Sequence, residues 1–194
     1  IESRSPQDQS DLVVSAPAAD REAVAAAFKR AREAQKEWRR NAVARADALH
    51  AAAAALDAAK DQVVDLMVRE VGKPLTESVM EHGRAVRILR YQAQSALDPD
   101  GDTLPAAPPA DLRTLLLARR RPRGVAGIIT PWNFPFAIPL WKAAPALAYG
   151  NAVVLKPSSD AIASALLIEE ILGKHLPEGI FTVVAGGRET AGAV

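Results

Sequence analysis

One polar residue, Asn133, stands between two prolines at the point where a predicted buried strand ends. The strand is the apolar stretch 124–129, and Pro131 and Pro135 each bias the preceding residue away from helix, so a turn is expected. Ligands of open α/β sheets bind at the carboxyl ends of the strands. An amide there can donate to an oxygen that becomes negative during a reaction, as in an oxyanion hole. The alternative role for Asn133 is to brace the turn.

A second polar side chain, Lys156, also follows a predicted strand and precedes a Pro-Ser-Ser sequence. An ammonium group at a strand's carboxyl end can donate to ribose hydroxyls or face a phosphate. Gly186, Gly187 and Gly192 surround the start of a later predicted helix, where a backbone can approach a pyrophosphate. This spacing is not G-x-G-x-x-G, so the motif is weak by itself. A surface lysine and ordinary turn glycines are the alternative interpretations.

The elements that must position these residues follow from hydrophobic periodicity. From residue 124 the sequence alternates between strands, near 125–130, 152–156 and 181–185, and helices, near 136–149 and 160–175, the first with Pro135 as its opening residue. Such alternation predicts an α/β fold with a Rossmann-like parallel sheet. We therefore assign residues 124–194 to the first half of a nucleotide-binding domain.

Residues 1–100 are predicted to form an N-terminal helical segment. Its first helix is expected to begin after Asp20 as N-cap, and a long helical region follows, with a break where Asp61 caps a new helix. Gly72 is expected to end that region in the left-handed conformation. A third helix, 75–97, is expected to bury Val79, Val86 and Leu89.

Residues 101–123 are predicted to form a β arm and linker. A strand is expected at 114–118, after a loop marked by Pro105, Pro108 and Pro109. The run Arg119-Arg-Arg-Pro-Arg123 is interpreted as a solvated edge strand and linker.

The composition limits the class of protein. With 49% apolar residues and a net charge of +1, the chain should be globular, and it offers no electrostatic case for nucleic acid or an anionic membrane. No apolar stretch is long enough to cross a bilayer. The absence of cysteine excludes disulfides and agrees with a cytoplasmic location. No metal site is predicted.

The stretches Thr130-Pro-Trp-Asn-Phe-Pro135 and Gly150-Asn-Ala-Val-Val-Leu-Lys156-Pro-Ser158 resemble the NAD(P)-dependent aldehyde dehydrogenase superfamily. Looser landmarks, such as Val71-Gly-Lys-Pro74, extend the resemblance over nearly the whole chain. It implies that Asn133 is the oxyanion donor, that Lys142 takes part in a proton relay, and that the cofactor is NAD or NADP. The cofactor-binding residues it implies are Ile129, Thr130, Pro131, Trp132, Lys156, Ser158, Ser159, Gly186, Gly187 and Gly192. An apolar channel for the aldehyde is implied at Phe134, Ile138 and Trp141, which share one predicted face.

Ser159 bears on the choice of cofactor. Many NAD-preferring members of the family carry glutamate at this position, because a carboxylate accepts from the ribose 2′-hydroxyl and repels a 2′-phosphate. A serine leaves room for that phosphate, so NADP should be tolerated.

The resemblance implies the N-terminal part of an enzyme that oxidises an aldehyde to a carboxylate, with a β arm that pairs subunits into a homo-oligomer, a dimer or tetramer. The family's cysteine nucleophile and glutamate base belong to motifs outside these 194 residues, and the chain contains no cysteine, so it is expected to be inactive by itself. Two alternatives stay open. One is a non-catalytic nucleotide-binding or assembly module; the other is a branch of the superfamily that reduces acyl-CoA or acyl phosphates.

Overall fold

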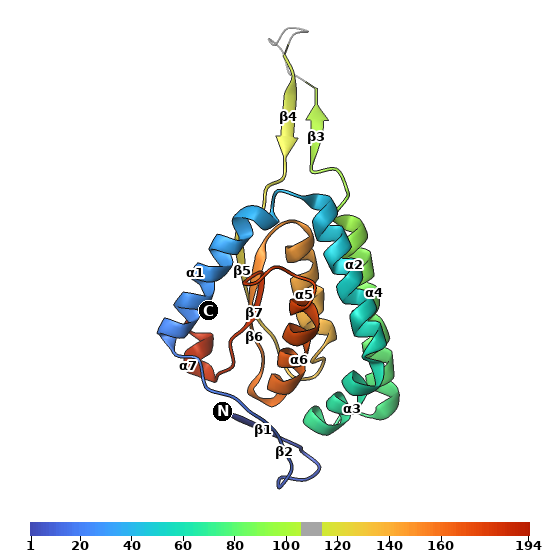
Figure 1. The fold of residues 1–194 in the computed structure, drawn as a ribbon, viewed down its shortest axis with the longest axis vertical. Helices are drawn as coiled ribbons and strands as arrows, with labels where there is room; N and C mark the ends of the chain where they lie inside the picture. The colour runs from blue at the N-terminus through green and yellow to red at the C-terminus, as the bar shows by residue number, and fades with distance from the viewer. Residues whose placement is uncertain (106–113) are drawn as a thin grey trace.

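The computed structural model describes residues 1–105 and 114–194. Its centre is a parallel sheet of three strands, β5 (Val125–Ile129), β6 (Ala152–Lys156) and β7 (Phe181–Val183), in the order β5-β6-β7 (Figure 1). The predicted α/β fold with a parallel sheet is confirmed. The outer strands end one and two residues earlier than expected, whereas β6 matches its predicted bounds and is buried throughout.

Helices cover both faces of this sheet. On one face lies α1 (Arg21–Trp38), which contacts all three strands; on the other lie α5 (Ala137–Ala148) and α6 (Ile162–Gly173), which connect the strands. Asp20 caps α1 as expected, since its Oδ1 accepts from Ala23 N at 2.8 Å. Two side chains of α1 tie it to the end of α5, because Trp38 Nε1 donates to Leu147 O and Gln35 Nε2 donates to Gly150 O.

A further layer packs outside α5 and α6 (Figure 1). It consists of α2 (Ala42–Ala58), α3 (Lys60–Val71) and α4 (Leu75–Ser95). Gly72 ends α3 at φ 66°, so the expected left-handed cap is confirmed.

Two expectations for these helices were wrong. α3 begins at Lys60 without a side-chain cap, because α2 and α3 follow one another directly through Ala59 and leave Asp61 in the first turn. Val79 is 38% exposed, since the face of α4 that packs on α2 and α5 carries Ala85 and Leu89 instead. His82 is buried, and its Nε2 lies 2.9 Å from Leu56 O. This side chain therefore packs between α4 and α2.

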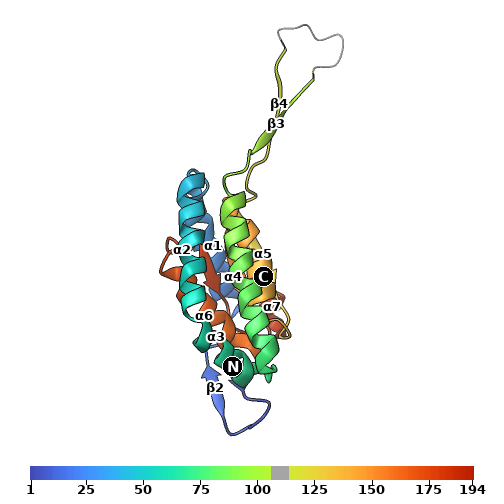
Figure 2. The same cartoon turned by 90° about the vertical axis from the view of Figure 1, so that its right-hand side faces the viewer.

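Two antiparallel hairpins complete the chain. The N-terminal one pairs β1 (Glu2–Arg4) with β2 (Leu12–Ser15). The other pairs β3 (Gly101–Leu104) with β4 (Leu116–Arg119) and projects from the body as an arm (Figure 2). The arm strand expected at 114–118 therefore starts two residues later, and the expected loop prolines Pro108 and Pro109 lie outside the described residues. No helix in the described ranges is both long and apolar enough to cross a membrane.

Candidate functional site

The carboxyl ends of the three parallel strands meet at one edge of the sheet. Ile129 pairs with Lys156, and Leu155 pairs with Val183. Past the strands the backbone stays paired, because Thr130 N donates to Lys156 O at 3.2 Å and Val184 N donates to Leu155 O at 2.8 Å. The turn 130–136, the segment 157–159 and the segment 184–187 therefore emerge side by side, and most of the predicted site residues lie on them.

The first of these segments presents a mostly exposed surface. Ile129 and Trp132 are each 52% exposed, and Pro131 and Asn133 are exposed as well. Thr130 is the exception: it is buried, and its Oγ1 has no hydrogen-bond partner among the described residues. A buried hydroxyl without a partner is costly, so this position calls for an explanation.

Lys156 lies just below the same edge. Its side chain is buried, and its Nζ donates to Pro157 O at 2.6 Å, which uses one of the three donors of an ammonium group. Burial lowers the pKa of Lys156 from its ordinary value, and the nearby carboxylate of Asp160 opposes that shift. The remaining donors can serve a ligand.

The two serines after Lys156 differ in their tasks. Ser158 Oγ accepts from Asp160 N at 3.3 Å and caps the short 3₁₀ helix η1 (Ser159–Ala161). Its hydroxyl is therefore engaged in local structure. Ser159 is half-buried and has no hydrogen bond to its side chain among the described residues, so its hydroxyl is available.

The glycines have a structural explanation of their own. A Cβ on Gly186 would lie 1.9 Å from Thr190 Oγ1, in the single-turn helix α7 (Arg188–Ala191), and that hydroxyl donates to Ala19 O. Gly186 is thus required by packing within the chain. Gly187 has open space around it, whereas Gly192 follows α7 and lies one helical turn away from the strand edge.

The helix after Asn133 begins later than expected. α5 starts at Ala137, so Pro135 lies before the helix and is not its first residue. Ile138 N nevertheless donates to Phe134 O at 3.1 Å, which places Phe134, Ile138 and Trp141 on one face. Phe134 and Ile138 are half-buried and Trp141 is 62% exposed, and Lys142 beside it is exposed.

The structure adds two residues that the sequence analysis did not assign to the site, Lys73 and Glu81. They form a buried ion pair of 2.5 Å directly under the turn that carries Asn133. Lys73 had served only as a landmark of the family resemblance. A signal for Glu81 existed in the sequence, because it precedes Ala85 and Leu89 by one and two helical turns and so lies on the buried stripe of α4.

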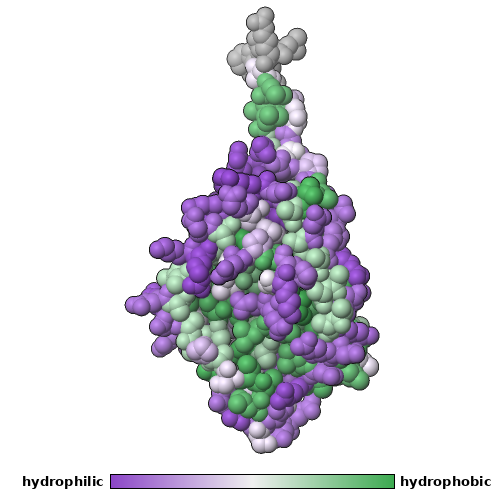
Figure 3. All heavy atoms as spheres, in the orientation of Figure 1, coloured by the Kyte–Doolittle hydropathy of each residue, from purple (hydrophilic) through white to green (hydrophobic). Residues whose placement is uncertain are grey.

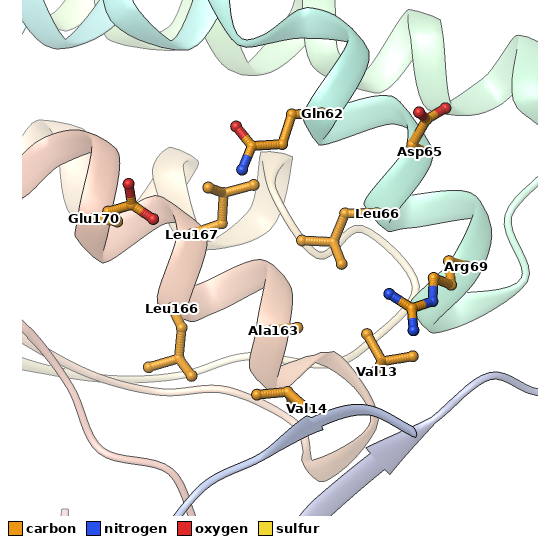
Figure 4. Close-up of a pocket in the computed structure, with 10 residues that line it drawn as sticks. All are labelled: Val13, Val14, Gln62, Asp65, Leu66, Arg69, Ala163, Leu166, Leu167 and Glu170. Atoms are coloured by element: carbon orange, nitrogen blue, oxygen red, sulfur yellow. The ribbon is translucent and has the colours of Figure 1, made fainter. Parts of the chain in front are cut away.

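Two pockets of the described structure lie away from these segments. One, of about 480 Å³, is an open hollow lined by β2, α3 and α6. Figure 4 shows Leu66 projecting from α3 toward α6, where Leu167 points toward Gln62 and Leu166 points toward Val14. Another, of about 830 Å³, lies at the base of the arm among several arginines, where Arg119 pairs with Asp100 at 2.6 Å. Neither pocket is lined by a predicted site residue.

Comparisons with known proteins agree on one family. The model of the aldehyde dehydrogenase family matches residues 1–194. The alpha-ketoglutaric semialdehyde dehydrogenase of Bacillus subtilis strain 168 is 36% identical over 194 residues, which are 99% of this chain and 39% of that protein. The chain thus spans about two fifths of the length of the curated relative.

Solved structures show the same fold. The NADP-dependent glyceraldehyde-3-phosphate dehydrogenase of Bacillus halodurans C-125, complexed with NADP, is 34% identical with a TM-score of 0.94, over 99% of this chain and 41% of that one. The NAD-dependent benzaldehyde dehydrogenase of Corynebacterium glutamicum is 29% identical with a TM-score of 0.91, over 99% of this chain and 42% of that one.

Proposed function

Since the chain belongs to the aldehyde dehydrogenase family, we propose that it is the N-terminal part of an enzyme that oxidises an aldehyde to a carboxylate with NAD or NADP. The observation that carries the proposal is the set of polar groups at the carboxyl ends of the parallel strands. An exposed amide, a buried hydroxyl without a partner and a buried ammonium group lie at the carboxyl ends of adjacent parallel strands, where open α/β sheets bind their ligands.

In this proposal the cofactor lies along the edge. Ile129, Thr130, Pro131 and Trp132 line it on one strand; Lys156, Ser158 and Ser159 line it on the next. When bound, the cofactor accepts the hydride from the substrate. The hydroxyl of Thr130 and the free donors of Lys156 would meet polar groups of the ligand. Gly187 leaves the backbone open to the pyrophosphate, whereas Gly186 makes room for Thr190 and Gly192 lies beyond α7.

Substrate and chemistry are proposed for the turn after β5 and for α5. Asn133 would donate its amide to the oxygen that becomes negative when a nucleophile adds to the aldehyde. Phe134, Ile138 and Trp141 would line an apolar approach to it, and Lys142, on the exposed side of α5, would take part in proton transfer. The nucleophile of the family is a cysteine, which this chain does not contain.

A second copy of the chain is the proposed partner. The arm exposes apolar side chains, with Leu115 at 70% and Leu117 at 58%, and free strand edges of this kind pair readily. We propose a homo-oligomer formed through this arm, and a cytoplasmic location. The division into residues 1–100, 101–123 and 124–194 also stays a proposal; buried residues of the first and last parts share one hydrophobic core.

The test is Asn133→Ala in the full-length protein that carries this chain. If the amide stabilises the oxyanion, the rate of the acylation step should fall by roughly 10²–10³-fold, the range for a single donor of this kind. Affinity for NAD or NADP should change little. The measurement is pre-steady-state cofactor reduction with a panel of aldehydes and both cofactors.

Gln94→Ala provides the matched control, because Gln94 is an exposed amide on α4. It should leave the rate unchanged. An Asn133→Ala variant that acylates at the wild-type rate would return Asn133 to the role of bracing the turn. Absence of aldehyde-dependent cofactor reduction in the wild type would contradict the proposed activity.

A further inference from the structure

The turn that carries Asn133 has little hydrogen bonding of its own. Pro131 and Pro135 lack N–H groups, and no residue from 131 to 135 donates a backbone hydrogen bond to another backbone group in the described structure. The Asn133 side chain also has no hydrogen bond among the described residues. Something outside the turn must therefore hold it in place.

The Lys73–Glu81 pair supplies these contacts from below. Lys73 Nζ donates to Glu81 Oε2 at 2.5 Å and to the backbone carbonyl of Asn133 at 2.9 Å, and it lies 3.8 Å from the centre of the Phe134 ring. Glu81 Oε1 accepts from Phe136 N and from Ala137 N, each at 2.9 Å. The pair therefore binds the backbone of the turn at Asn133 and again where the turn leads into α5.

Burial makes these contacts specific. The side chain of Lys73 is 6% exposed and that of Glu81 is 0% exposed, so water does not compete for either group. The ion pair comes from the connection between α3 and α4 and from α4 itself, which lie well before the turn in sequence. Among the described interactions, Lys73 contacts Asn133 only at its backbone carbonyl, so the carboxamide of Asn133 stays free at the carboxyl end of β5.

From these contacts we propose that Lys73 and Glu81 are positioning residues for Asn133. The proposal rests on the proposed oxyanion role of Asn133. By fixing the carbonyl of Asn133 and the first N–H groups of α5, the pair sets the direction in which the carboxamide leaves the turn. The competing explanation is that the pair only joins α4 to α5. Such a pair would affect stability without acting through Asn133.

A double-mutant cycle in the full-length protein separates the two explanations. Lys73→Met removes the donor to the Asn133 carbonyl and should lower the acylation rate by about 10-fold to 100-fold, because small displacements of a catalytic group cost factors of this size. In an Asn133→Ala background the same change should lower the rate by less than about twofold, since its target is already gone. The affinity for NAD or NADP should stay unchanged in all variants.

The combined variant Lys73→Met and Glu81→Gln is the control that separates an effect on stability from an effect on positioning. Lys73→Met alone leaves a buried carboxylate without its partner and should lower the melting temperature. Glutamine keeps an Oε1 for Phe136 N and Ala137 N and removes the charge, so the combined variant should melt closer to the wild type. Its acylation rate should nevertheless stay low, because the Asn133 carbonyl has no donor. This variant replaces Lys73→Met in the cycle if the single variant does not fold.

Arg84→Met is the matched control. Arg84 is exposed, lies 6.0 Å from the centre of the same Phe134 ring and has no contact with Asn133 among the described interactions. It should acylate at the wild-type rate. Two results would overturn the positioning role. One is that the combined variant Lys73→Met and Glu81→Gln recovers its acylation rate together with its melting temperature. The other is that Lys73→Met lowers the acylation rate equally with Asn133 and with Asn133→Ala. If Asn133→Ala alone changed nothing, the proposed function of Asn133 would fail first.

Discussion

Ser159 illustrates how a single side chain can bear on cofactor choice. It follows the buried Lys156 by three residues and begins η1, at the edge where the nucleotide is proposed to bind. NAD and NADP differ by a phosphate on the adenine ribose, so the group that faces the 2′ position decides between them. A half-buried neutral hydroxyl neither repels this phosphate nor accepts as strongly as a carboxylate.

Replacing Ser159 with Glu in the full-length protein should therefore shift the preference toward NAD. A single hydrogen bond to a charged group contributes about 1.5–3 kcal/mol, and about 1.4 kcal/mol is a factor of ten. We expect the NAD/NADP ratio of kcat/KM to rise by at least about tenfold. Steady-state kinetics with both cofactors at saturating aldehyde measures this ratio.

Ser159→Gln separates charge from size, because glutamine has nearly the shape of glutamate and no charge. The ratio should move much less in this variant. A ratio that stays constant or moves toward NADP in Ser159→Glu would show that residue 159 does not face the 2′ position.

At the scale of elements, Glu70 joins α3 to α6. Its carboxylate accepts from Ala163 N at 2.6 Å, from Ser164 N at 2.8 Å and from Ser164 Oγ at 2.6 Å, and so satisfies the start of α6. Burial raises the pKa of Glu70 from its ordinary value of 4.5, and these hydrogen bonds oppose the rise. Because the net shift of this pKa is upward, the carboxyl group of Glu70 holds its proton more tightly in the folded chain than in the unfolded chain.

The stability contributed by Glu70 should consequently fall as pH rises. It is fully present below the ordinary pKa of 4.5 and is lost as pH rises through the raised value. Glu70→Gln cannot titrate, so the difference in unfolding free energy between wild type and variant should shrink as pH rises above 4.5. Urea unfolding over a pH series measures this difference.

Glu170→Gln is the control for this series, because Glu170 is an exposed carboxylate on α6, in an ion pair with Lys174. Its effect on unfolding should be small at every pH. If the difference in unfolding free energy between wild type and Glu70→Gln grew with pH, the hydrogen bonds to Glu70 would outweigh burial in setting its pKa.

The whole molecule is a layered body with one arm. Figure 2 shows how far β3 and β4 stand from the rest of the chain, and Figure 3 shows apolar side chains on the arm. A two-stranded ribbon with exposed leucines is marginally stable in water by itself. The proposed second copy of the chain would cover this surface.

Leu117→Glu tests this assembly in the full-length protein. A charge on the arm should oppose pairing of its apolar surface and lower the mass of the particle in solution. Light scattering after size exclusion measures that mass. Leu75→Glu is the control, because Leu75 is 61% exposed at the start of α4 and away from the arm. An unchanged mass for Leu117→Glu would exclude the arm as the interface.

The sequence alone determined the class of fold, whereas the location of the proposed site within that fold stays a prediction. Strand and helix periods alternate from residue 124 onward, and these local patterns survive folding because buried strands must be apolar and helices must bury one stripe. The ends of the strands followed from Pro131 and from Pro157, which cannot donate to a ladder. Since parallel strands end at one edge, the meeting of their carboxyl ends was predictable as well.

Tertiary structure decided what each polar group does. Glu81 and Lys73 lie far from Asn133 in sequence, and only the packing of α4 on α5 brings them beneath the turn. The folded chain also shows that a Cβ at Gly186 would meet Thr190, and that Thr130 Oγ1 is buried without a partner in the described structure. Hydrophobic patterns indicate which face is buried, whereas a hydrogen bond depends on two groups whose separation in sequence carries no local signal.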